Sequence, residues 1–162
     1  MRRVPLALLA AAACALAACS TQAAQSSPAA AESASVHSFS GLRVIPVTLT
    51  ENGRTHTIRA ELAETPQQQA QGLMFRREMG ADEGMLFPSD FPQVRSFWMR
   101  NTVIPLDLIF VGPDKRIINI IANAAPYSLD PLESAGPAIA VLELNGGRAA
   151  ELGLKPGSGV EW

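Results

Sequence analysis

Cysteine is almost absent from this 162-residue chain. The two cysteines, Cys14 and Cys19, lie near its start. The rest of the chain therefore has no disulfide bond and no cysteine metal site, and its stability must come from an apolar core. The two histidines, His37 and His56, form no metal-binding motif, and no HExxH sequence, Walker loop or dinucleotide fingerprint is present. These absences leave no known catalytic motif, and we expect no cofactor.

The sequence also lacks an excess of positive charge. Its 13 basic and 15 acidic residues give a formal net charge of −2. A nucleic-acid partner is therefore disfavoured, because phosphate backbones attract basic surfaces. No apolar run after the first 18 residues is long enough to cross a membrane.

The first 18 residues predict a cleaved lipoprotein signal peptide. Arg2 and Arg3 precede an apolar run of about 15 residues, a length typical of secretory signals. The run ends in Leu16-Ala17-Ala18-Cys19, which resembles a bacterial lipobox. The resemblance implies that Cys19 carries lipid, palmitate included, and Ser20 after it implies the periplasmic face of the outer membrane. Ordinary secretion with cleavage further along is the alternative.

The remainder divides into a tether and one domain. Residues 19–40 are rich in Ala, Ser and Gln, and they offer too little apolar surface to form a core. Residues 41–162 are long enough to fold alone, and we expect a monomer.

Alternating apolar residues and turn signals predict a mainly β domain. Asn52-Gly53 is a strong hairpin signal between two alternating segments. Thr65-Pro66 begins a helix of about two turns, which Gly72 ends, and a single helical turn follows Gly147. Closely spaced strands without long helices favour a compact antiparallel β-sandwich or barrel-like fold. The predicted strands cover residues 42–50, 54–62, 84–87, 94–99, 106–111, 116–122, 138–144 and 159–162.

Several ordered blocks resemble an uncharacterised bacterial and archaeal family, domain of unknown function 192. They are Gly72-Leu-Met-Phe-Arg76, Gly84-Met-Leu-Phe87, Phe97-Trp-Met-Arg-Asn-Thr102, Ile104-Pro-Leu-Asp107, Val141-Leu-Glu-Leu-Asn-Gly-Gly147 and Leu152-Gly-Leu-Lys-Pro-Gly157. The resemblance covers roughly residues 43–162, and Ser158 stands where the family usually has Asp. It implies a small β-rich fold, often exported, and brings no established reaction.

The block around Trp98 is a candidate ligand site. Phe97 and Met99 are expected on one side of a strand, and Trp98 and Arg100 on the other. Trp98 is either a ligand platform or a core residue. Asn101 and Thr102 either shape the turn that follows or supply polar contacts beside Trp98.

Two carboxylates interrupt apolar strands and are further candidates. Asp107 alternates with Ile109 and Val111, so it requires a partner if it is buried, and Arg76 is a plausible one. Glu143 lies in a similar position. Either the two are separately paired structural groups, or they converge with Arg76 on one cleft as an anion site or acid/base pair.

These residues support three functional hypotheses. The preferred one is a membrane-anchored periplasmic domain that binds a small molecule or an envelope protein without catalysis, using Arg76, Trp98, Asn101, Thr102, Asp107 and Glu143. The second is a hydrolase that uses Asp107 and Glu143. The third is a Cu(I) carrier that uses Met74, Met85 and Met99, although methionines among apolar neighbours more often fill a core.

Overall fold

The computed structural model describes residues 35–162. The signal peptide, Cys19 and most of the predicted tether lie outside these residues. The folded domain already includes residues 35–40, because strand β1 pairs with β2, with Ser35 opposite Val44. No helix within residues 35–162 is long and apolar enough to cross a membrane.

The domain is mainly β, as predicted, with two short helices. Its elements are β1 (Ser35–Val36), β2 (Arg43–Glu51), β3 (Arg54–Leu62), α1 (Pro66–Gln71), β4 (Glu83–Gln93), β5 (Ser96–Phe97), β6 (Leu106–Val111), β7 (Ile117–Ala124), β8 (Leu132–Glu133), β9 (Ala138–Asn145), α2 (Arg148–Glu151) and β10 (Gly159–Glu161).

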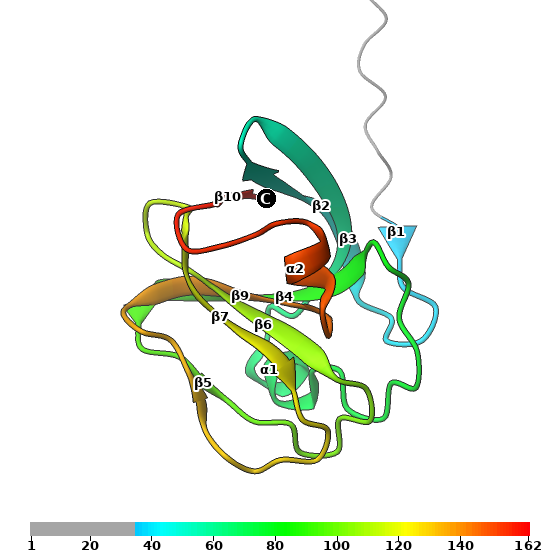
Figure 1. The fold of residues 1–162 in the computed structure, drawn as a ribbon. Helices are drawn as coiled ribbons and strands as arrows, with labels where there is room; N and C mark the ends of the chain where they lie inside the picture. Colours follow the sequence, from blue (N-terminus) through cyan, green and yellow to red (C-terminus); the bar gives the residue numbers. More distant parts are fainter. Residues whose placement is uncertain (1–34) are drawn as a thin grey trace, which may run out of the picture. The chain divides into compact units, whose positions relative to one another are not determined.

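Eight strands form one mixed sheet that does not close. Their order is β1-β2-β3-β4-β9-β6-β7, and β10 lies off this path and pairs antiparallel with residues 48–50 of β2. Figure 1 shows α2 and β10 above the strands β4, β9 and β6, toward the β2–β3 hairpin, and α1 and β5 below these strands. β5 and β8 form a separate two-stranded sheet. The arrangement agrees with the predicted sandwich-like β fold.

The hairpin and helix signals are confirmed. Asn52 and Gly53 both have positive φ, at 49° and 74°, which the tight turn between β2 and β3 requires. Thr65 caps α1 in a capping box with Gln68, and Pro66 occupies the first turn. Gly72 ends this helix.

Three details of the expected strands are corrected. β3 and β4 pair in parallel, because α1 and a long connection return the chain to the same end of the sheet. β4 continues past Pro88 to Gln93. Its pairing with β9 is irregular between these two residues, which accommodates the proline. The predicted strand 94–99 shortens to β5, because the backbone of Met99 instead bonds the carbonyl of Ser128.

The two faces of the sheet support separate apolar cores. Leu142 and Leu144 of β9 point into the first core, with Ile109 and Val111 of β6. Val141 of β9 points into the second core, as do other side chains of β4 and β6, namely Met85, Phe87, Leu106, Leu108 and Phe110. Residue parity on β6 and β9 therefore decides which core a polar side chain enters.

Candidate functional site

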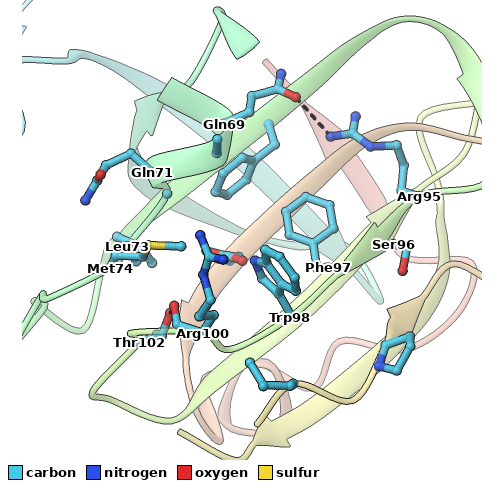
Figure 2. Close-up of a pocket in the computed structure, with 16 residues that line it drawn as sticks. Gln69, Gln71, Leu73, Met74, Arg95, Ser96, Phe97, Trp98, Arg100 and Thr102 are labelled. Carbon is cyan, nitrogen blue, oxygen red and sulfur yellow. Dashed lines mark hydrogen bonds between the residues drawn. The ribbon is translucent and has the colours of Figure 1, made fainter. Parts of the chain in front are cut away.

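The second core opens into a pocket of about 500 Å³. Its walls come from α1 and the residues that follow it, from the segment 95–102, and from β4 and β9; we call it the Trp98 pocket. It is lined by Gln69, Ala70, Gln71, Gly72, Leu73, Met74, Phe87, Arg95, Ser96, Phe97, Trp98, Arg100, Thr102, Leu129, Pro131 and Glu143. Figure 2 shows Trp98 and Arg100 across the pocket from Leu73 and Met74.

Glu143 supplies the buried carboxyl group of the Trp98 pocket. Its strand position is opposite Leu108 of β6 and Met85 of β4, both members of the second core. Only 5% of the residue is exposed, and within residues 35–162 it makes no side-chain hydrogen bond or ion pair. Its oxygens are not among the fully enclosed polar atoms that lack a partner, so they keep access to the pocket. Burial raises the pKa of Glu143 to about 8. The side chain is therefore mostly a neutral carboxylic acid at pH 7, able to donate a hydrogen bond.

Trp98 and Arg100 form the exposed side of the pocket. Trp98 is 48% exposed, and the Arg100 guanidinium carbon lies 4.5 Å from the centre of an indole ring. Met99 between them is buried, so the predicted alternation holds although the strand is shorter. The interpretation of Trp98 as a core residue is wrong, because its side chain is half exposed and the neighbouring Met99 is the residue of this segment that packs in the core.

Asn101 and Thr102 take different roles. Asn101 has φ 57°, and its carbonyl accepts the Phe75 N–H at 2.8 Å, so it shapes the turn and does not line the pocket. Thr102 is buried and does line it. Of the six ligand-site candidates, the Trp98 pocket thus brings together Trp98, Thr102 and Glu143.

Arg95 closes one end of the pocket. Its guanidinium donates to Ser89 and, at 3.2 Å, to Gln69, which lies on α1. It also lies 5.4 Å from the centre of the Phe97 ring. Partial burial lowers the pKa of Arg95. Arg95 is thus committed to holding α1 against the 95–102 segment.

Asp107 does not belong to the Trp98 pocket. It pairs with Leu144, so it points to the first core, whereas Glu143 on the next position of β9 points to the second. The carboxylate is fully buried and accepts three backbone N–H groups, from Asn123 at 2.8 Å, Gly147 at 2.9 Å and Ala149 at 2.8 Å. Asp107 therefore caps α2, whose own N-cap, Gly147, has no side chain.

Arg76 is not the partner of Asp107. It forms a buried, two-bonded ion pair with Glu61, at 2.8 and 3.0 Å, and lies 4.7 Å from the Phe39 ring centre. Ser40 also bonds Glu61, and His37 Nδ1 lies 3.6 Å from that carboxylate. Glu61 could not be recognised from the sequence as a partner of Arg76, because its other neighbours, His37 and Ser40, lie in the predicted tether.

The three candidate methionines serve as apolar side chains. Met85 and Met99 are buried in the second core, and Met74 lines the Trp98 pocket. The Met74 sulfur accepts a contact from Asn101 Nδ2 at 3.8 Å. Among residues 35–162, no group of three or more His, Cys, Asp or Glu side chains is arranged to hold a metal ion.

Several pocket residues were not singled out from the sequence. Arg95 and Phe97 flank Trp98, and Leu73 follows the glycine that ends α1. The ordered blocks that begin at Gly72, Phe97 and Val141 were the available signal, since each contributes to the same pocket. Residues far apart in the sequence meet there because the connection between the parallel strands β3 and β4 carries α1, and because β4 pairs with β9.

Comparisons with known proteins agree with this fold. A protein of unknown function from Novosphingobium aromaticivorans DSM 12444 is 58% identical, with a TM-score of 0.77 over 79% of this chain and 91% of its own. A candidate transcription regulator from Sinorhizobium meliloti 1021 is 44% identical, with a TM-score of 0.70 over 72% of this chain and 91% of its own. No curated protein matches. Residues 47–162 match DUF192, described as an uncharacterized ACR, and the chain therefore belongs to this family of uncharacterised proteins.

Proposed function

We propose that this domain binds a small molecule in the Trp98 pocket and catalyses no reaction. The observation that carries the proposal is Glu143, a carboxyl that is only 5% exposed, lines a pocket of about 500 Å³ and forms no ion pair among residues 35–162. Burying a carboxyl without a partner lowers the stability of the fold. Groups that destabilise a protein in this way are common in binding sites. Apolar walls with a few convergent polar groups are typical of small-molecule sites.

The paired-carboxylate hydrolase is not supported. Asp107 and Glu143 point to opposite faces of the sheet, and Asp107 is occupied by three backbone N–H groups. The residues that line the pocket include no His, Cys or Asp to pair with Glu143. A general acid and base, or a nucleophile with its base, require two such groups within hydrogen-bond reach.

The regulatory role in the name of the Sinorhizobium relative finds no support in the charge of this chain. Acidic residues outnumber basic ones by 15 to 13, whereas DNA-binding surfaces are strongly basic. We therefore favour a small molecule as the bound partner.

A neutral aromatic probe, 1-naphthylacetamide, tests the proposal. In a two-dimensional NMR titration, we expect shifts at the Trp98 indole N–H and at the Leu73 and Glu143 amides, with Trp162 outside the pocket as the internal reference. Trp98→Ala should weaken binding by about fivefold, the value of one aromatic contact. Phe91→Ala removes another exposed ring, 62% exposed and outside the pocket, and should leave affinity unchanged. Shifts that avoid the pocket, or equal loss in both variants, would contradict the proposal.

Membrane anchoring through Cys19 is part of the same proposal, although this residue lies outside the described part of the chain. The lipobox-like sequence 16–19 supports it. Mass spectrometry of the protein from membranes should find a lipid-modified N-terminal Cys19, and Cys19→Ala should abolish the modification. An unmodified N-terminus further along the chain would refute the anchor.

A further inference from the structure

The charges that line the Trp98 pocket favour an anion. Its ionisable groups are Arg95 and Arg100 from the 95–102 segment and Glu143 from β9. The walls from α1 and from Leu129 and Pro131 contribute none. With Glu143 protonated, the pocket therefore presents positive charge only.

Arg100 is placed to bind the charged group of a ligand. It is exposed, and within residues 35–162 it forms no ion pair. The guanidinium carbon lies 4.5 Å from a ring centre of Trp98, so the aromatic contact restrains the position of the charge. A planar, oriented guanidinium matches the two oxygens of a carboxylate. Arg95, by contrast, already donates to Ser89 and Gln69.

The remaining walls suit an apolar ring or chain. Leu73, Met74 and Phe97 line the interior, and Trp98 and Leu129, 48% and 64% exposed, lie at the surface. Phe97 is held edge-on against Phe87, at 5.1 Å between ring centres. This wall is therefore formed before a ligand arrives, which reduces the entropy cost of binding.

We propose that the Trp98 pocket binds an organic anion of the carboxylate class, with an apolar body against Leu73, Met74 and Trp98 and its charged group on Arg100. This inference rests on the proposed function and names its ligand class. The Glu143 carboxyl donates a hydrogen bond to an acceptor on the ligand. Above pH 8 the carboxyl ionises and repels the anion, so affinity falls as pH rises through this value.

Three probes of matched size separate the ligand classes: 1-naphthylacetate, 1-naphthylacetamide and 2-(1-naphthyl)ethylammonium. In the full domain at pH 6.5, we expect the anion to bind about tenfold tighter than the amide, the value of one charge-assisted hydrogen bond. Arg100→Gln should reduce the anion to the affinity of the amide and leave the amide unchanged. Arg77→Gln, on the surface outside the pocket, is the matched control.

The pH arm of the experiment tests Glu143. Affinity for 1-naphthylacetate should fall between pH 6.5 and pH 9, and Glu143→Gln should remove that dependence. Equal binding of anion and amide, or preference for the ammonium, would overturn the anion inference while the pocket function stands. Failure of all three probes to shift the Trp98 indole would overturn the pocket function itself.

Discussion

Asp107 and Glu143 are two buried carboxyl groups on neighbouring strands, yet their surroundings differ completely. Asp107 enters the first core, where three backbone N–H groups bind it. Glu143 enters the second core, where it meets apolar side chains and a pocket. One position of strand register separates a structural carboxylate from a candidate functional one. Burial alone therefore does not identify a functional carboxyl; its hydrogen bonds do.

Replacing Asp107 should produce the largest effect. In Asp107→Asn, an NH₂ group replaces one of the two carboxylate oxygens. At least one of the three backbone N–H groups would then face this NH₂ group and lose its acceptor. We expect the free energy of unfolding to fall by about 4 kcal/mol, since hydrogen bonds to charged groups are strong and unmet buried donors are costly. Urea denaturation at constant slope measures it. Asp90→Asn, an exposed site, should change stability by less than about 0.5 kcal/mol; equal losses would contradict the capping role.

Glu61 extends the comparison to a third buried carboxylate, one paired with a cation. Glu61→Gln should reduce stability by about 3 kcal/mol, because it leaves the buried Arg76 charge without its counterion. Glu64→Gln breaks the exposed pair with Arg43 and should cost about 0.5 kcal/mol or less. Thermal or urea unfolding of both variants decides, and a Glu61 variant as stable as wild type would show that the pair contributes nothing.

Glu143→Gln should change stability in the opposite direction. Folding raises the pKa from 4.5 to about 8, so between these values the unfolded chain releases a proton that the folded chain retains. Stability therefore falls as pH rises through this window and becomes level above it. The variant lacks this dependence and should already be more stable than wild type by about 3 kcal/mol at pH 7. Denaturation at pH 5 and pH 8 tests it; a variant less stable than wild type at pH 8 would mean that the carboxylate has a stabilising partner.

Local signals predicted much of this fold. The hairpin at Asn52-Gly53, the cap at Thr65 and the alternation around Met99 each depend on neighbours in the sequence, and each is confirmed. The alternation of Asp107 with Ile109 was also correct, and so was its need for a partner. Local pattern is sufficient wherever a few adjacent residues determine the conformation.

Relations between distant segments were not predictable in the same way. The partner of Arg76, the parallel pairing of β3 with β4 and the opposite faces of Asp107 and Glu143 all depend on register between remote strands. A shift of one residue in the pairing of two strands would move every side chain of one strand to the opposite face of the sheet. The sequence of a single strand does not specify this register. Trp98, Thr102 and Glu143 line one pocket, although Trp98 and Thr102 lie in one block of the family resemblance and Glu143 lies in another.

The protonation of Glu143 is the most direct test of this account. Selective ¹³C labelling of glutamate side chains, with Glu143→Gln to assign the resonance, allows its carboxyl to be followed by NMR from pH 3 to pH 10 in the intact domain. We predict a midpoint near pH 8, the value that burial imposes on a carboxyl without a partner. A midpoint near the ordinary value of 4.5 would contradict the account, because Glu143 would then be ionised at neutral pH and the pocket would no longer favour an anion.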